Sequence, residues 1–506
     1  MSLKRNVVAN YASQLYATMI GIVLIPLFLT YMGPEAYGLV GFFAMLQAWF
    51  NVLDLGLTPT LARESARFFG GALAPIDYRR LYRALSTIFL SVAAIGGGLL
   101  FALAPVVSDK WLQVRELPVG QVVSAVQIMA LSVAMRWMGG LYRGVITGAE
   151  RLVWLGGFNA LIATLRFAAV FLSMSIWGYT PAVFFWHQLV VAALELLFLY
   201  LKSQGLLPVR SAGAEPIGWS FRQIRPLLRF SLTIALTSSI WILVTQTDKL
   251  ILSGLVPLSE YGYFTLAVLA AGGITILTGP ISTALLPRLA HLHAQGNHAE
   301  IVRLYHKSAQ LVSVITGSLA VTLVVCAEPL LFAWTGNREL TQAAAPILQL
   351  YAIGNGLLAL GAFPYYLQYA LGDLRLHLIG NVVMVCVLVP AIGLAATRAG
   401  GIGAGWVWVV LNALYLFGWV GYVHAKLVPG LHSGWIVDNV FLIILPTALV
   451  GWLVGLTTFN AQTRTLAFAQ TLLVGLASLA TATLASPACR SAAIRLVKSG
   501  WQRAPG

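Results

Sequence analysis

The chain has 506 residues, of which 59% are hydrophobic and 9% are charged, and its formal net charge is +15. Soluble globular domains carry roughly 25% charged residues, so this composition excludes a water-soluble fold and predicts a protein embedded in a bilayer. On such a chain the positive charge is expected to face anionic lipid headgroups, and it does not indicate a nucleic-acid partner.

Fourteen mostly apolar segments follow one another along the chain, each long enough to cross a hydrocarbon core of about 30 Å. They cover residues 8–31, 38–61, 83–107, 122–146, 153–175, 180–203, 230–253, 262–286, 306–334, 344–370, 377–397, 402–425, 437–458 and 465–486. The sequence therefore predicts an all-α, polytopic membrane protein with about 14 transmembrane helices.

The basic residues between these segments predict the orientation of the chain. With the N-terminus in the cytoplasm, 22 of the 31 lysines and arginines fall in inside segments and 5 in outside segments. This distribution follows the positive-inside rule and predicts that both the N- and the C-terminus are cytoplasmic.

The remaining four basic residues lie within the predicted spans: Arg136 and Arg143 in the fourth, Arg166 in the fifth and Lys249 in the seventh. A charge at a helix centre costs about 2.5–3.5 kcal/mol on insertion scales, so such a side chain should face a polar cavity or a partner. Arg136 and Arg143 are seven residues apart and share one helix face. We predict that these four residues bind substrate.

Three acidic residues, Asp54, Glu195 and Asp248, also fall at membrane depth and are candidates for coupling transport to an ion. Simpler interpretations remain open at this stage. Arg143 could snorkel to the interface, and the adjacent Asp248 and Lys249 could neutralise each other. Polar stripes in the first and seventh spans, containing Ser13 and Asp248 respectively, predict a shared cavity, or else hydrogen bonds between helices.

An internal repeat divides the chain. YRGVITGAER (residues 142–151) and YLQYALGDLR (366–375) share a Tyr, a Gly and an Arg at an offset of 224 residues, which also relates the Tyr-Gly pair at 37–38 to that at 261–262. Such repeats build transporters whose two lobes expose a central site to each side in turn. The repeat predicts two six-helix lobes, at residues 1–203 and 230–427, joined by a cytoplasmic linker at 204–229. Two additional helices follow at 428–486, and then a basic tail at 487–506.

Catalytic signatures do not emerge from the sequence. It has no P-loop, no kinase motif and no plausible catalytic triad, and the outside loops are short. Cys326, Cys386 and Cys489 are scattered without the spacing of a metal site. We therefore expect neither an enzyme nor a cofactor.

Several runs carry a resemblance to a known family. They are NYASQLYATMIGIVLIPLFLTYMGPEAYGLVGFF, LDLGLTPTLAR, GLYRGVITGAER and TDKLILSGLVPLSEYGYFTLA, at residues 10–43, 53–63, 140–151 and 247–267. They resemble the polysaccharide exporters and O-antigen flippases of the multidrug/oligosaccharidyl-lipid/polysaccharide (MOP) superfamily, and the resemblance covers nearly the whole chain.

The resemblance implies a MATE-like fold and a flippase that moves an undecaprenyl-pyrophosphate-linked oligosaccharide across the bacterial inner membrane. A cationic lumen is common in the family, and Arg136, Arg143 and Arg166 would supply it here. The implied partners are the lipid-linked oligosaccharide, membrane lipids, H⁺ or Na⁺ as coupling ion, and a polysaccharide polymerase with other assembly proteins.

Three alternatives to this function remain: a peptidoglycan-precursor (lipid II) flippase, a multidrug or cation antiporter of the same fold, and a membrane polysaccharide polymerase. An antiporter of organic cations would favour a lumen of net negative charge, which the three arginines of the first lobe oppose.

Overall fold

The computed structural model describes residues 3–208, 225–457 and 462–501. Most of the predicted linker (209–224) and the last five residues of the predicted tail (502–506) lie outside this part. The contacts divide the chain into two compact units, Met1–Gly262 and Tyr263–Gly506. The division into two six-helix lobes stays a prediction.

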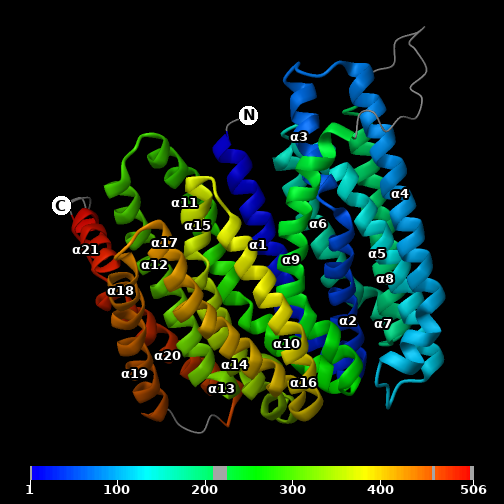
Figure 1. The fold of residues 1–506 in the computed structure, drawn as a ribbon. Coiled ribbons are helices and arrows are strands. Elements are labelled where there is room, and N and C mark those ends of the chain that lie inside the picture. Colours follow the sequence, from blue (N-terminus) through cyan, green and yellow to red (C-terminus); the bar gives the residue numbers. More distant parts are fainter. Residues whose placement is uncertain (1–2, 209–224, 458–461, 502–506) are drawn as a thin grey trace. The chain divides into compact units, whose positions relative to one another are not determined.

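The first unit is all helical in the part that the structure describes. Its helices are α1 (Leu3–Met32), α2 (Pro34–Phe50), α3 (Leu57–Phe69), α4 (Pro75–Val106), α5 (Val119–Gly148), α6 (Leu152–Phe167), α7 (Ala169–Trp177), α8 (Pro181–Gln204) and α9 (Arg225–Leu255), and it includes the first turn of α10 (Leu258–Ala271) (Figure 1). Proline at the first helical position begins α2, α4 and α8, where its missing N–H has no helical partner to lose.

The second unit continues with helices. They are α11 (Gly273–Ala294), α12 (His298–Val325), α13 (Ala327–Thr335), α14 (Arg338–Gly361), α15 (Phe363–Leu371), α16 (Arg375–Leu414), α17 (Val420–Leu427), α18 (Leu431–Ile436), α19 (Leu442–Thr457), α20 (Arg464–Ala485) and α21 (Pro487–Trp501). Ala399 and Gly400 have non-helical dihedrals inside α16, so a kink separates the predicted spans 377–397 and 402–425. The second of these spans continues past the end of α16 through a π-helical turn into α17.

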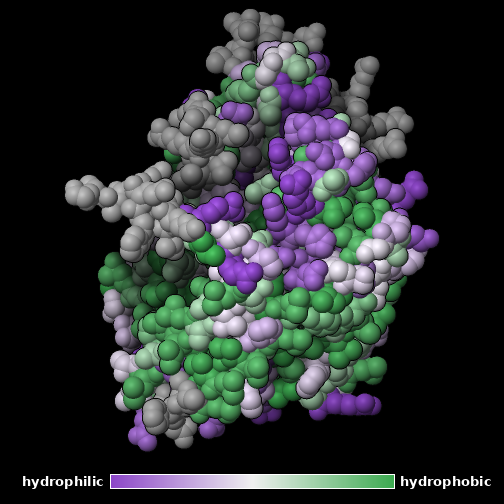
Figure 2. Space-filling view, turned by 90° about the vertical axis from the view of Figure 1, so that its left-hand side faces the viewer, coloured by the Kyte–Doolittle hydropathy of each residue, from purple (hydrophilic) through white to green (hydrophobic). Residues whose placement is uncertain are grey.

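Within the described ranges, twelve helical segments are long and apolar enough to cross a membrane, which confirms a multi-pass membrane protein. The predicted number of fourteen spans is not itself tested by this count. On the face shown in Figure 2, hydrophobic side chains form a broad continuous surface and hydrophilic side chains gather above it, as expected where a lipid-facing belt meets the headgroups.

The predicted second span, 38–61, is wrong at its C-terminal end. α2 stops at Phe50, a 3₁₀ turn follows, and Leu55 and Gly56 take left-handed dihedrals before α3 begins. The Asp54 carboxylate accepts hydrogen bonds from the backbone N–H and the hydroxyl of Thr58, which stabilises the first turn of α3. The apolar run continues through this break, which is why hydrophobicity alone did not show it.

α3 packs against a row of glycines on α5. A Cβ atom added to Gly148 would lie 2.3 Å from the carbonyl oxygen of Ala62 and 2.4 Å from the Cβ of Ser65. Gly144, one helical turn earlier, is similarly close to the backbone of Thr58, at 3.0 Å. The small residues of α5 thus allow two backbones to approach closely, as in other membrane helix pairs.

We expect Gly148→Ala to destabilise the protein by about 1–3 kcal/mol, because the added methyl group overlaps backbone that cannot rotate away. Thermal unfolding of the purified protein in detergent would measure this. Gly157→Ala on α6 is the matched control, since its Cβ would meet nothing within 4 Å. Equal melting temperatures for the two variants would contradict the tight contact between α3 and α5.

Repeat-related glycines meet at the end of the first unit that the basic-residue count assigns to the outside, here called the outer end. A Cβ on Gly38 of α2 would lie 2.1 Å from the carbonyl oxygen of Leu258 in α10. A Cβ on Gly262 would lie 3.1 Å from the backbone nitrogen of Gly38. The two glycines are related by the 224-residue offset, so the repeat found in the sequence brings equivalent positions together.

A buried carboxylate orders the loop at the same outer end. Glu35, only 3% exposed, accepts hydrogen bonds from the backbone N–H groups of Arg115, Glu116 and Leu117 at 2.6–2.7 Å. The loop then reaches the end of α9, where Trp111 Nε1 donates to Ser253 Oγ at 3.0 Å. Glu35 therefore holds the connection that contacts α9.

We expect Glu35→Ala to speed amide hydrogen exchange at residues 115–117 by about tenfold or more, because losing hydrogen bonds to a charged group costs about 1.5–3 kcal/mol each. Exchange measured by mass spectrometry on the protein in nanodiscs would show it. Glu116→Gln is the control, since it keeps the backbone donor and the Glu35 acceptor. If exchange in this loop did not change in Glu35→Ala, the loop would be held by other contacts.

Candidate cationic site

Two arginines of α5 face two polar residues of α8 at matching heights. Arg143 Nη2 lies 2.5 Å from Glu195 Oε1, and Arg136 Nη2 lies 2.8 Å from Gln188 Oε1. Arg136 and Arg143 are seven residues apart on α5, and Gln188 and Glu195 are seven residues apart on α8. The two contacts are therefore separated by two helical turns, about 10 Å. α5 and α8 run side by side in Figure 1.

A single amide oxygen of α2 joins two of the arginines. Gln47 Oε1 accepts from Arg136 Nη1 at 2.8 Å and from Arg166 Nη2 at 3.3 Å. The guanidinium of Arg136 also lies over the ring of Phe43, 5.1 Å from its centroid. Two like charges are therefore held close by a neutral group, which is unfavourable in a low-dielectric interior unless an anion joins them.

The charges of this cluster do not balance. Three guanidinium groups face one carboxylate, Glu195, whose ion pair is with Arg143. In the part of the chain that the structure describes, the hydrogen-bond acceptors of Arg136 and Arg166 are neutral amide oxygens. The Nε–H groups of both are buried and have no described acceptor. The cluster therefore carries a net charge near +2 and has donors to spare.

The cluster opens into a cavity of about 520 Å³. It is lined by residues of α1, α5, α6 and α8: Ser13, Gln14, Ala17, Thr18, Arg143, Asn159, Ile162, Ala163, Arg166, Phe167 and Glu195. Its volume lies within the range of about 300–1,000 Å³ typical of small-molecule sites. Arg136 lies behind this lining, connected to Arg166 through Gln47.

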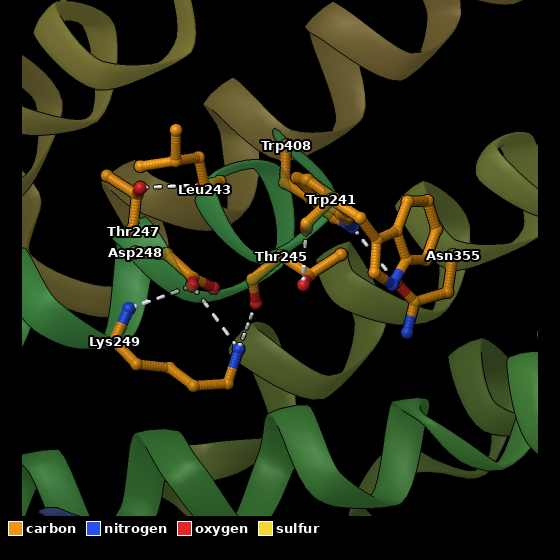
Figure 3. Close-up of polar contacts among 8 residues, drawn as sticks. All are labelled: Trp241, Leu243, Thr245, Thr247, Asp248, Lys249, Asn355 and Trp408. Atoms are coloured by element: carbon orange, nitrogen blue, oxygen red, sulfur yellow. Dashed lines mark hydrogen bonds and ion pairs between the residues drawn. The ribbon is translucent and has the colours of Figure 1, made fainter. Parts of the chain in front are cut away.

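Lys249 and Asp248 do not line this cavity. Lys249 Nζ donates to the backbone carbonyl of Thr245 at 2.8 Å and lies 3.3 Å from Asp248 Oδ1 (Figure 3). Both of these Lys249 contacts lie within α9, and the substrate role predicted for Lys249 stays a prediction. Asp54 also lies outside the cavity lining. Its carboxylate instead stabilises the start of α3.

Ser13 of the polar stripe in the first predicted span does line the cavity. Three neutral residues that orient the guanidinium groups, Gln47, Gln188 and Asn159, were not predicted from the sequence. One signal was present, because Gln188 precedes Glu195 by the same seven residues that separate Arg136 from Arg143.

The second half of the repeat lacks this charge. At the 224-residue offset, the positions of Arg136, Arg143 and Arg166 are occupied by Leu360, Leu367 and Pro390. The position of Glu195 is occupied by Trp419, whose ring packs against Gly380. At each of these four related positions, the residue in the first half is charged and the residue in the second half is uncharged.

These features define a multi-pass membrane protein with a cationic cavity inside its N-terminal bundle. The sequence model of the family described as "Polysaccharide biosynthesis protein" matches residues 3–293, more than half of the chain. The chain belongs to this family.

Two relatives and one solved structure show how far the similarity extends. The "Putative O-antigen transporter" of Shigella flexneri is 20% identical over 430 residues, covering 82% of this chain and 97% of that protein. The "Probable lipid II flippase MurJ" of Rhizobium meliloti (strain 1021) is 28% identical over 251 residues. This match covers 46% of this chain and 44% of that protein, so it spans less than half of either. The structure titled lipid II flippase MurJ, inward closed conformation, has a TM-score of 0.69 at 13% identity and covers 95% of this chain and 98% of that one.

Proposed function

We propose that this protein is a flippase that moves an oligosaccharide linked through pyrophosphate to a polyprenyl lipid across the bacterial inner membrane. The observation that carries this proposal is the pair of guanidinium groups, Arg136 and Arg166, that converge on the neutral oxygen of Gln47 beside the cavity. In this proposal both termini are cytoplasmic, as the basic residues predict.

The cationic site provides what the headgroup of such a lipid needs in order to cross a membrane. A pyrophosphate and its sugars cannot enter hydrocarbon without partners, because unpaired charges and hydroxyls are costly there. Arginine offers a planar fork of donors to phosphate oxygens, and charge-assisted bonds of this kind are about twice as strong as neutral ones. The lipid tail can remain among the acyl chains while the headgroup crosses through the cavity.

Coupling to an H⁺ or Na⁺ gradient is part of the proposal. Glu195 is its candidate because it is the one of the three predicted coupling carboxylates that lines the cavity. Asp54 and Asp248 have local structural contacts instead. Transport would then alternate between states open to either side, with α2 and the start of α10 in contact at the outer end in one of them.

Lipid II transport is the second candidate, because both a relative and a solved structure with this fold are named as lipid II flippases. Lipid II chemistry also places sugars on a polyprenyl pyrophosphate, so the same cationic site would serve it. The net positive cavity disfavours an antiporter of organic cations.

Complementation separates these functions. The gene would be expressed in one strain lacking its O-antigen flippase and in another depleted of its lipid II flippase. Restored surface polysaccharide in the first strain alone is the expected result, and rescued growth of the second would favour lipid II. Drug resistance without either rescue would contradict a flippase and favour the antiporter.

A further inference from the structure

The two oxygens of the Glu195 carboxylate have different surroundings. Oε1 forms the ion pair with Arg143 at 2.5 Å. Oε2 is buried, and no described residue donates a hydrogen bond to it. The side chain as a whole is 9% exposed, and Glu195 forms part of the cavity wall.

A phosphate alone does not suit this oxygen. An ionised carboxylate only accepts hydrogen bonds, and the oxygens of a pyrophosphate diester are acceptors of the same negative sign. A phosphate held by Arg143 and Arg166 would therefore leave Oε2 without a partner, and a buried unsatisfied acceptor is unfavourable. A ligand that fits the whole cavity needs a hydroxyl or an amide N–H close to its phosphate.

The rest of the lining supplies surroundings for such a group. Ser13, Gln14 and Thr18 give α1 a polar side toward the cavity. Hydroxyl and amide side chains both donate and accept, as the hydroxyls of a sugar require. Phe167 adds an aromatic surface at the same cavity.

We propose that Glu195 is a carbohydrate-contacting residue, whose Oε2 accepts a hydrogen bond from a hydroxyl or N-acetyl N–H of the first sugar attached to the phosphate. The proposal rests on the proposed function, because it takes the phosphate to be held by Arg143 and Arg166. Glu195 then makes the cavity prefer a glycosylated lipid to the same lipid without sugar. A site built to bond such a group discriminates against a ligand that lacks it.

Equilibrium binding tests this preference. The full-length protein in nanodiscs would be titrated with polyprenyl diphosphate and with polyprenyl diphosphate carrying one N-acetylhexosamine, with no ion gradient present. The wild type should bind the glycosylated probe about 10- to 100-fold more tightly, as expected for a hydrogen bond to a charged acceptor. In Glu195→Gln the preference should fall to about onefold, because an amide N–H₂ replaces the acceptor Oε2.

Binding of the sugar-free probe should change much less in Glu195→Gln than binding of the glycosylated probe, since the variant keeps an oxygen for Arg143. Asn159→Ala is the control for loosening Arg143, because it removes the other partner of that guanidinium. It should weaken both probes alike and keep the preference for the glycosylated one.

Three results would overturn the proposal. They are equal binding of the two probes by the wild type, an equal loss for both probes in Glu195→Gln, or a loss of preference in Asn159→Ala as large as in Glu195→Gln. If the wild type bound neither probe, the proposed function would itself be contradicted, and that pattern differs from the other three.

Discussion

Replacing Arg166 by glutamine is expected to reduce export of surface glycan by about 30-fold or more. The substitution removes one of the two guanidinium groups that share Gln47 Oε1 and lowers the net charge of the cavity cluster from near +2 to near +1. Losing one partner of a buried, hydrogen-bonded charge pair costs about 2–5 kcal/mol, and 1.4 kcal/mol corresponds to tenfold. Arg136→Gln should have a similar effect, since Arg136 contacts the same oxygen.

The measurement is surface polysaccharide in a strain lacking its own flippase, with protein in the membrane fraction determined by immunoblot. Arg166→Lys should restore part of the export, because it keeps the charge but loses the fork of donors. Arg398→Gln is the control, because this arginine is exposed at the kink of α16. Normal export by both Arg136→Gln and Arg166→Gln would remove the cationic cavity from the mechanism.

The variants Arg136→Gln and Arg166→Gln should fold at least as well as the wild type. Arg136 and Arg166 repel each other, and their acceptors are neutral. The thermal stability of Arg166→Gln in detergent should therefore equal or exceed that of the wild type, while transport falls. This opposite behaviour distinguishes a residue kept for binding from one kept for folding.

The second large effect is expected at Gly38. In Gly38→Ala the new methyl group would lie 2.1 Å from the carbonyl oxygen of Leu258, so α2 and α10 must separate. Overpacking of this kind costs about 1–3 kcal/mol, which reduces the population in which α2 and α10 are in contact by about 5- to 150-fold. Export should fall, because the variant favours a state that is open on one side.

Hydrogen exchange of the backbone around residues 253–262 would follow this opening. The Leu258 N–H donates to the Gln113 carbonyl at 3.0 Å at the outer end, and its exchange should accelerate in Gly38→Ala. Gly98→Ala on α4 is the matched control, since nothing lies within 4 Å of its Cβ position. Wild-type export together with unchanged exchange would show that the α2–α10 contact does not gate transport.

The membrane fold could be predicted from the sequence because a bilayer demands long apolar helices, and this pattern is strong in every span. The 224-residue repeat could also be found in the sequence, and it relates Gly38 to Gly262, whose backbones approach closely. The two six-helix lobes inferred from the repeat stay a prediction. The break at Leu55 and Gly56 could not be predicted, since it depends on two left-handed residues inside an apolar run.

The candidate site was predicted only in part. The cost of burying a charge pointed to Arg143, Arg166 and Glu195, which line the cavity. The same argument selected Lys249, which lies outside this cavity and contacts Asp248 and a carbonyl oxygen of its own helix, so its substrate role stays a prediction. Gln47 and Gln188 gave no such signal, because a neutral amide costs much less to bury and its role depends on which helices become neighbours.

The charge of this site belongs to one half of the repeat, whereas the glycine contact of the outer end uses a residue from each half. In the proposed function, the residues that set cargo preference and those that bring α2 and α10 together would therefore occupy separable parts of the sequence. New glycans would then be accommodated by substitutions on α1, α5, α6 and α8 alone. Gly38 and Gly262 would meanwhile both have to remain glycine, because a side chain on either residue would overlap the backbone of the neighbouring helix.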